Sequence, residues 1–331
     1  MYIKDFVLKL IIITGLVIVL MLVSGANVHV SDPYSRAVDF DYSVKRLQSV
    51  NTQPDLLGGD IDTVVTKQNT ENAEMFNECL FALLIGESDN QVYVAKNAHR
   101  RMYPASLTKL MTGIIVCDRI EAGVITLDDE VTLTDYYDLT DEGVGPSPLT
   151  YGDTISVKDL LYALMIESNN YYALILADYV AGDEASFCKL MNEKAHAIGA
   201  TNTHFANPHG LDDPDHYSTA YDMYLIIKEA HSHELMRKID EFDNYAYTYT
   251  DAAGNVIDME AEATNYFVNG NAQLPAGVKL STWKTGTTDG AGYCLALYFE
   301  KNGKKYVSVA SVLEDKIGLY DATARLLSMV N

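Results

Sequence analysis

Residues 103–116 read YPASLTKLMTGIIV, and this stretch predicts a helix that begins beside a serine. Proline at position 104 suits a first helical turn, and the apolar residues after it recur with the helical period. Ser106 therefore lies where free backbone N–H groups and the helix dipole favour negative charge. Lys109 follows one turn later on the same face, so a neutral Lys109 amine could take the Ser106 proton. This pattern is typical of a serine nucleophile activated by a base.

A second polar group, Ser168-Asn169-Asn170, lies between two apolar stretches with helical period, residues 160–167 and 171–176. The pattern predicts two helices that meet at a polar corner. Taken alone, such a corner is also what an ordinary loop between helices looks like, because short polar motifs recur by chance.

A third group, Lys284-Thr285-Gly286, occurs once in the chain. The β-branched, aromatic and apolar residues on either side, 278–283 and 293–299, predict two strands with Lys284 at the end of the first, near a turn. Gly286 lets a ligand approach the backbone closely, and the neighbouring threonines offer hydroxyl and N–H groups to an extended peptide. Alone, the group is more typical of a hairpin turn than of a binding site. Lys284 is also a candidate for a second cation beside Lys109.

Further matches to these short patterns lie elsewhere in the chain, among them Ser49-Val50-Asn51, which repeats the serine-asparagine spacing. Ser186 and Lys189 repeat the serine-lysine spacing, but they fall in a predicted helix over residues 184–197 and are interpreted as a solvated face. Ser88-Asp89-Asn90 lies between two apolar runs and predicts a hairpin turn. The order along the chain therefore favours Ser106 as the nucleophile.

In their order and spacing, the three motifs resemble those of the penicillin-recognising serine peptidases, specifically the D-alanyl-D-alanine carboxypeptidases, or low-molecular-mass penicillin-binding proteins. The resemblance runs from about residue 74 to the C-terminus, about three quarters of the chain. It is closest at residues 104–112, which match the nucleophile segment of the family almost residue by residue. Other segments that resemble the family are residues 191–199, 207–211, 217–222 and 291–295.

The resemblance implies a role for each motif. Ser106 would be the acylated nucleophile and Lys109 its general base, while Ser168 relays a proton and Asn170 holds the peptide groups of the substrate. The facing wall would consist of Lys284, Thr285, Gly286 and Thr287, with the backbone N–H groups of Ser106 and Thr287 as the oxyanion hole.

The implied reaction is removal of the terminal D-alanine from a peptidoglycan stem peptide that ends in D-Ala-D-Ala. Ser106 attacks the carbonyl of the penultimate D-alanine, and water later releases the acyl-enzyme. β-Lactams would be covalent inhibitors at the same serine, and we expect neither a cofactor nor a metal.

Two positions depart from the family pattern. Asn169 stands where the family usually has glycine and is followed by Tyr171 and Tyr172, which is expected to narrow the cleft or change its preference. The family also carries an arginine at the start of its last helix, which meets the terminal carboxylate of the substrate. Here the matching position is Leu319; Lys316 lies nearby, but lysine is a point charge rather than a bidentate fork.

Composition narrows the class of protein. The chain has 331 residues, 48% of them hydrophobic, which is enough for one large core or two modest ones. A net charge of −22 without a basic stripe argues against nucleic acid as a partner.

The N-terminus predicts export. Lys4 and Lys9 precede an uncharged apolar run over residues 10–26 that ends in Ser24-Gly25-Ala26, so residues 1–26 form a signal peptide or a membrane anchor. Residues 27–73 are interpreted as a linker and 74–331 as the catalytic domain. We expect an extracytoplasmic protein, secreted or anchored to the cell membrane, that contacts the membrane only through the N-terminal segment.

Cysteine and histidine give weaker signals. Cys79, Cys117, Cys188 and Cys294 lie in apolar surroundings without a metal-binding spacing, which is more typical of buried thiols than of disulfides. His204, His209 and His216 lie among aspartates, yet their spacing matches no zinc signature.

The resemblance implies an α+β fold of the β-lactamase/D,D-peptidase type. An antiparallel five-stranded sheet would be flanked by helices, with a helical subdomain inserted at about residues 127–230. Strand patterns at both ends of the catalytic domain, with helices between, agree with this arrangement. Two alternatives stay open at this point: a class A-like β-lactamase, which would need a glutamate that is missing between Glu193 and Glu229, and a non-catalytic peptidoglycan-binding relative.

Overall fold

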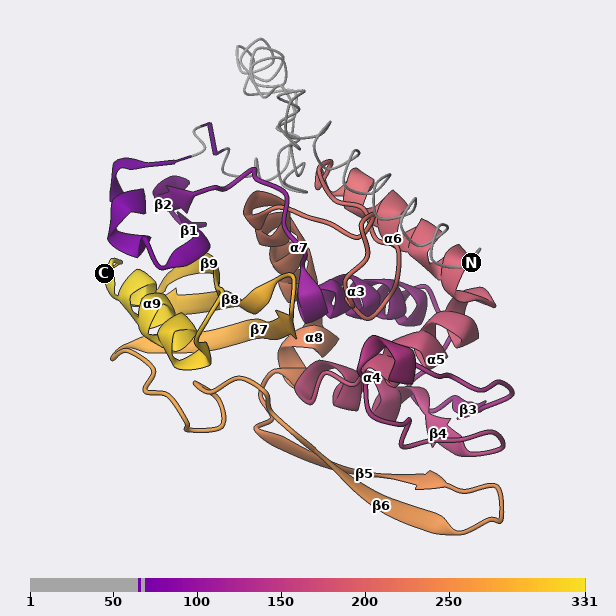
Figure 1. The fold of residues 1–331 in the computed structure, drawn as a ribbon. Helices are drawn as coiled ribbons and strands as arrows, with labels where there is room; N and C mark the ends of the chain where they lie inside the picture. The colour runs from indigo at the N-terminus through magenta and orange to yellow at the C-terminus, as the bar shows by residue number, and fades with distance from the viewer. Residues whose placement is uncertain (1–64, 67–68, 331) are drawn as a thin grey trace, which may run out of the picture. The chain divides into compact units, whose positions relative to one another are not determined.

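The computed structural model describes residues 65–66 and 69–330 (Figure 1). The predicted signal peptide or anchor at residues 1–26, and the predicted linker up to residue 64, lie outside the described residues. Among the helices that are described, none combines the length and the apolar character needed to cross a membrane. The 3₁₀ helix η1, Glu71–Phe76, spans the predicted domain boundary at residue 74.

The core is built on a five-stranded sheet in the order β2-β1-β9-β8-β7, with every neighbouring pair antiparallel. Its strands come from the two ends of the described chain: β1 Cys79–Gly86, β2 Gln91–Lys96, β7 Val278–Thr288, β8 Gly292–Lys301 and β9 Lys304–Val312. Strands β1, β8 and β9 bury nearly all of their side chains, so both faces of the sheet are covered. Helices α7 and α9 pack against it (Figure 1). The predicted five-stranded antiparallel sheet is confirmed.

Helices fill the middle of the chain. They are α3 Thr108–Glu121, α4 Val157–Ile166, α5 Asn170–Ala181, α6 Glu184–Ala197, α7 Ala220–Ser232 and α8 Glu234–Ile239, with α9 Lys316–Ser328 near the C-terminus. Helix α3 is buried along ten consecutive residues from Thr108 to Cys117 and contacts α4, α5, α6, α7 and α8. The nucleophile segment therefore begins a central helix of the core. Two other 3₁₀ helices are η2, Ala105–Leu107, and η3, Thr140–Glu142.

A second sheet, in the order β3-β4-β5-β6, was not predicted. It joins two short strands, β3 Glu130–Thr132 and β4 Thr154–Ser156, to the hairpin of β5 Asn244–Thr250 and β6 Val256–Glu262. The tyrosines of β5 alternate with small or polar residues, and Tyr245 and Tyr247 are buried while their neighbours are exposed. This alternation is the sequence signal that could have revealed the sheet.

The structure corrects the predicted place of Lys284. It lies inside β7 and not at the strand's end, because the hairpin with β8 continues past it to the pair Thr288 and Gly292. The turn follows at residues 289–291. All four cysteines are buried and free among the described residues.

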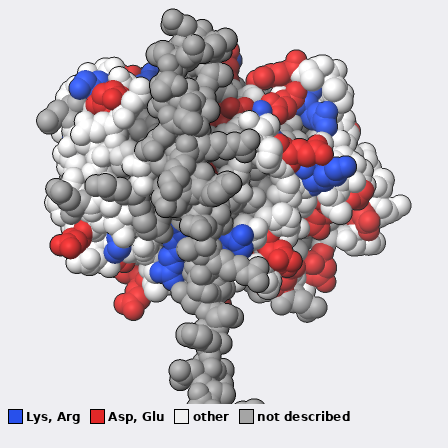
Figure 2. All heavy atoms as spheres, turned by 90° about the horizontal axis from the view of Figure 1, so that it is seen from above, with Lys and Arg blue, Asp and Glu red and all other residues white. Residues whose placement is uncertain are grey.

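Charged side chains of both signs are interspersed on the face shown in Figure 2. On the described residues visible there, the excess negative charge of the chain is not gathered into one patch.

Candidate active site

The nucleophile segment is held in an unusual backbone conformation. Ala105, the residue before Ser106, has φ +47°, and η2 passes directly into α3 at Thr108. Two glycines pack on this backbone. A Cβ added to Gly210 would lie 1.9 Å from the Ala105 carbonyl oxygen, and one added to Gly286 would lie 3.0 Å from the Ser106 nitrogen. Strained backbone of this kind persists only where the surroundings over-determine it, which is common at functional sites.

Lys109 is fully buried one turn after Ser106. Its Nζ lies 2.9 Å from Ser106 Oγ, 2.6 Å from Asn170 Oδ1 and 2.6 Å from the His209 carbonyl oxygen. Burial lowers the pKa of Lys109 well below its usual value, and the neighbouring charge of Lys284 lowers it further. The amine is therefore disposed to be neutral while it touches the Ser106 hydroxyl.

The second motif forms the corner between α4 and α5. Ser168 has φ +69°, which turns the chain sharply at this point. Asn169 caps α5, because its side chain accepts a hydrogen bond from the backbone N–H of Tyr171. Asn170 then begins the helix and reaches Lys109. The predicted polar corner between two helices is confirmed.

The tyrosines after this motif do not narrow the cleft, contrary to expectation. Tyr171 is 2% exposed and Tyr172 fully buried. The Tyr171 hydroxyl donates to the Gly145 carbonyl oxygen at 2.8 Å, and the Tyr172 hydroxyl lies 2.8 Å from that of Tyr247. Both rings point into the core because they fall on the inner face of α5. Asn169 also fits without strain, because its polar side chain serves as the cap.

The third motif supplies the facing wall. Lys284 is fully buried, and its Nζ donates to Ser168 Oγ at 2.9 Å and to the Thr285 carbonyl oxygen at 3.1 Å. Burial lowers the pKa of Lys284 to about 7, opposed by the negative charge of Asp240. The Thr285 hydroxyl lies 2.6 Å from that of Thr264. The three motifs thus converge through two lysine contacts, Lys109 with Asn170 and Lys284 with Ser168.

These residues line a cavity of about 220 Å³. From the predicted set it is lined by Ser106, Ser168, Asn170, Thr285, Gly286 and Thr287; the buried amines of Lys109 and Lys284 lie behind the surface. Six residues outside the three motifs also line it: Thr264, Tyr293, Cys294, Lys316, Leu319 and Tyr320. Lys316 and Leu319 lie where the sequence departs from the family pattern, and residues 293–294 belong to a segment that resembles the family, whereas nothing in the local sequence marks Thr264.

The loop over residues 207–216 supports the nucleophile segment from behind. The His209 carbonyl oxygen accepts from Lys109, and the Pro208 carbonyl oxygen accepts from Thr112 at 2.6 Å. His216 lies 2.7 Å from Thr108 Oγ1 through Nε2, while its Nδ1 accepts from the Ala206 N–H at 3.0 Å. Because Nδ1 is an acceptor, the proton of neutral His216 is on Nε2 and is donated to Thr108.

The three histidines that lie among aspartates, His204, His209 and His216, are therefore part of this loop, and their polar groups have partners within the protein. His216 binds Thr108, and His204 Nδ1 lies 2.6 Å from the Asp215 carbonyl oxygen. Among the described residues, the His, Cys and acidic side chains that come close enough to hold an ion are Asp118, Glu121 and His233. They lie at the far end of α3 from Ser106, where Lys194 Nζ, 3.1 Å from Asp118, already supplies positive charge.

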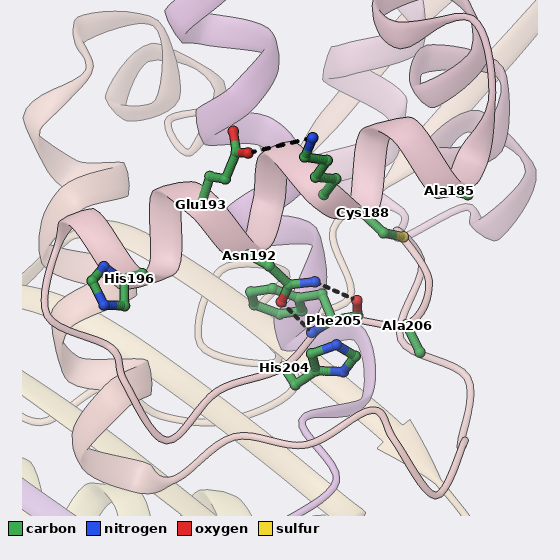
Figure 3. A pocket seen from close by; sticks show the side chains of 9 residues that line it. Ala185, Cys188, Asn192, Glu193, His196, His204, Phe205 and Ala206 are labelled. Carbon is green, nitrogen blue, oxygen red and sulfur yellow. Dashed lines mark hydrogen bonds and ion pairs between the residues drawn. The ribbon is translucent and has the colours of Figure 1, made fainter.

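A broader depression of about 680 Å³ lies over α6 and residues 204–206 (Figure 3). Asn192 of α6 joins the two sides of this depression, because its side-chain amide donates to the Phe205 carbonyl oxygen at 2.9 Å and accepts from the Phe205 N–H at 2.8 Å. The second serine-lysine pair belongs to this helix. Ser186 binds Asp183, and Lys189 has a side chain 77% exposed, 4.0 Å from Glu193. The interpretation as a solvated face fits these contacts.

Comparison with known proteins gives a consistent result. The family model described as D-alanyl-D-alanine carboxypeptidase matches residues 67–316. The chain is 31% identical over 237 residues to the carboxypeptidase DacF of Bacillus subtilis, covering 72% of this chain and 58% of that protein. It is 34% identical over 231 residues to DacC of Escherichia coli, covering 69% and 54%. The chain therefore spans less than two thirds of the length of these relatives.

Solved structures show the same fold. A Streptomyces DD-transpeptidase superposes with a TM-score of 0.68 at 23% identity, over 76% of this chain and 96% of that one. The carboxypeptidase DacD of Francisella tularensis superposes with a TM-score of 0.65 at 24% identity, over 84% and 75%. At this identity, the likeness concerns the fold alone.

Proposed function

The chain belongs to the D-alanyl-D-alanine carboxypeptidase family, and from this premise we propose that it removes the terminal D-alanine from peptidoglycan stem peptides through an acyl-enzyme on Ser106. One observation carries the proposal. Lys109 Nζ lies 2.9 Å from Ser106 Oγ, and this serine lines a cavity together with Ser168, Asn170 and Thr287.

The hydrogen bonds of Lys109 support its role as general base. A neutral amine has two N–H donors and one lone pair. The His209 carbonyl oxygen and Asn170 Oδ1 accept the two N–H groups, each at 2.6 Å. The lone pair is then left for the Ser106 hydroxyl, which donates to it. Lys109 takes this proton as Ser106 attacks the carbonyl carbon of the penultimate D-alanine.

The position of β7 supports peptide binding beside Ser106. It is an edge strand of the five-stranded sheet, so its outer row of backbone groups faces no neighbouring strand. In this row the Trp283 N–H donates to Asp240 and the Thr285 carbonyl oxygen accepts from Lys284, and an extended substrate would pair with the groups at Thr285 and Thr287. The tight approach of Gly286 to the Ser106 nitrogen brings this strand against the nucleophile. The N–H groups of Ser106 and Thr287 form the oxyanion hole that binds the developing negative charge.

Ser168 and Lys284 complete proton transfer. Lys284 holds the Ser168 hydroxyl at 2.9 Å, and Ser168 passes a proton to the amine of the departing D-alanine. Water then attacks the ester on Ser106 and releases the shortened peptide. β-Lactams acylate Ser106 as covalent inhibitors. The enzyme works outside the cytoplasm, with its N-terminal segment cleaved or anchored in the membrane.

Labelled penicillin tests the proposal. The full chain is incubated with it, the adduct is mapped by mass spectrometry, and release of D-alanine from a D-Ala-D-Ala peptide is measured. A long-lived adduct on Ser106 together with D-alanine release supports the carboxypeptidase. Ser106→Ala should lose both signals, whereas Ser186→Ala, in the second serine-lysine pair, should keep both.

The two alternatives predict different results. Rapid turnover of penicillin without a lasting adduct would identify a β-lactamase. Absence of both adduct and peptide cleavage would exclude the catalytic role and leave a peptidoglycan-binding protein.

A further inference from the structure

The loop behind the nucleophile segment reaches three parts of the active site within four consecutive residues. The His209 carbonyl oxygen accepts a hydrogen bond from the base Lys109 at 2.6 Å. Gly210 packs against the Ala105 carbonyl group, directly before the nucleophile. Asp212, two positions later, contacts the strand that carries the third motif. The proposed mechanism gives the carboxylate of Asp212 no part.

Asp212 holds the turn between β7 and β8 with both of its carboxylate oxygens. Oδ1 accepts a hydrogen bond from the Thr288 hydroxyl at 2.6 Å, and Oδ2 accepts one from the Gly290 N–H at 2.8 Å. The Thr288 hydroxyl oxygen in turn accepts from the Ala291 N–H at 3.1 Å. Hydrogen bonds to an ionised carboxylate are stronger than those between neutral groups. The carboxylate therefore ties the loop to the turn at two points.

The same turn packs closely against the chain that leads into the nucleophile. A Cβ added to Gly290 would lie 2.7 Å from Asp212 Oδ2 and 2.7 Å from Cδ2 of the Tyr103 ring. Gly290 therefore lies between the loop that contains Asp212 and the segment that contains Ser106. Because close-packed groups move together, the position of the turn is coupled to that of the nucleophile from both sides.

This attachment lies next to the proposed oxyanion hole. Its two donors are the backbone N–H groups of Ser106 and Thr287, and Thr287 is bonded directly to Thr288. Donors of this kind stabilise a developing charge only when their positions relative to the reacting atoms are fixed. β7 is an edge strand with a neighbouring strand on one side only, so a contact at its end restrains where its last residues lie. Asp212 supplies such a contact.

We infer that Asp212 is a positioning residue for the oxyanion hole: by binding Thr288 and Gly290, it sets the place of the Thr287 N–H relative to Ser106. The inference rests on the proposed function, because the oxyanion hole serves the same acyl transfer. Asp212 is exposed and Thr288 half-buried, so their hydrogen bond can be removed with little disturbance of the core. A variant at Asp212 therefore changes the restraint on β7 more than the stability of the fold.

The test uses a peptide boronic acid in which boron replaces the carbonyl carbon that Ser106 attacks. Ser106 Oγ bonds to boron and its proton passes to Lys109, so the tetrahedral boronate carries the negative charge and mimics the transition state. Affinity for this compound, kcat/KM for an acylated tripeptide that ends in D-Ala-D-Ala, and the unfolding temperature are measured. The proteins are the full chain and its variants Asp212→Ala, Asp212→Asn, Thr288→Val and Asp215→Ala. Asp215, an exposed carboxylate of the same loop, is the control that matches the change in charge.

Asp212→Ala should lower kcat/KM and the affinity for the boronic acid by the same factor, about 5- to 30-fold. This is less than the loss of about 100-fold or more that follows deletion of an oxyanion donor, because the Thr287 N–H is loosened but still present. Asp212→Asn keeps one acceptor oxygen and should lose less. Adding Thr288→Val to Asp212→Ala should cost less than the product of the single effects, because both remove the same hydrogen bond. The unfolding temperatures should stay close to that of the wild type, and Asp215→Ala should behave as the wild type.

Three results would overturn the inference while the proposed function stands: unchanged boronic acid affinity in Asp212→Ala, an equal loss in Asp215→Ala, or a loss that appears only where the variant begins to unfold. If the wild type leaves the peptide uncleaved and penicillin does not acylate Ser106, the proposed function fails, and the inference fails with it.

Discussion

Replacing Gly210 by alanine should slow acylation of Ser106, although Gly210 is not among the described residues that line the cavity. Its φ is +95°, a conformation that costs an L-residue about 1–2 kcal/mol. The added Cβ would also lie 1.9 Å from the Ala105 carbonyl oxygen and 2.4 Å from its carbonyl carbon. Carbon and oxygen atoms in contact are normally more than about 3 Å apart, so the backbone must move by about 1 Å. The Ala105 carbonyl carbon is bonded to the Ser106 nitrogen, so the displacement passes directly to the nucleophile.

A displacement of about 1 Å in a catalytic constellation typically costs about 100-fold in rate. We therefore expect Gly210→Ala to lower the rate of acylation by labelled penicillin about 100-fold. Gly254→Ala is the matched control. Gly254 has φ +88° in the turn between β5 and β6, and no atom lies within 4 Å of its added Cβ. It should lose about 1–2 kcal/mol in the free energy of unfolding, from backbone strain alone, and acylate at the normal rate.

The assay is the pseudo-first-order rate of adduct formation, measured with the thermal unfolding of each variant. Gly210→Ala should be slower at temperatures where it is fully folded. If both variants acylate at the wild-type rate, Gly210 does not hold the nucleophile segment. If both are equally slow, the effect comes from general instability and not from the contact with Ala105.

Two further predictions concern pH. Lys284→Met removes a charge that lowers the pKa of Lys109, so the pKa of Lys109 should rise and the acid limb of the acylation profile should move to higher pH; an unmoved limb would contradict this coupling. Burial lowers the pKa of His216 from 6.5 to about 4. Between these two pH values, His216 is protonated in the unfolded state and neutral in the folded state. Stability conferred by neutral His216 is complete above pH 6.5 and should fall by about 3 kcal/mol on acidification to pH 4. In denaturant unfolding, the free energy of unfolding of His216→Gln should fall less than that of the wild type between pH 6.5 and pH 4. An equal fall in both proteins would show that His216 is not the source of this pH dependence.

The main elements of the fold could be predicted because their signals are local. The helical period after Ser106 predicted α3, and the apolar stretches around Ser168 predicted α4 and α5. Prediction of the five-stranded sheet needed the family resemblance as well, because the sequence pattern of a strand does not indicate which other strand it pairs with. The β5–β6 hairpin was not predicted, although the tyrosines of β5, NYAYTYT, recur at every second position as in a strand with one buried face. Alternation of this kind does not show which strand lies beside it, so the second sheet depends on tertiary packing.

The sequence by itself determined which chemistry is available: a serine and lysine one helical turn apart, and a lysine-threonine-glycine group rich in strand formers. These relations depend on spacing along the chain, which helix and strand geometry convert directly into distance. Only the tertiary structure decided the rest. It placed Lys284 inside β7, buried Tyr171 and Tyr172 away from the cleft, and brought His209, Thr264 and Lys316 to the site. Such contacts join residues tens to hundreds of positions apart, and they arise when packing of the core closes the chain on itself.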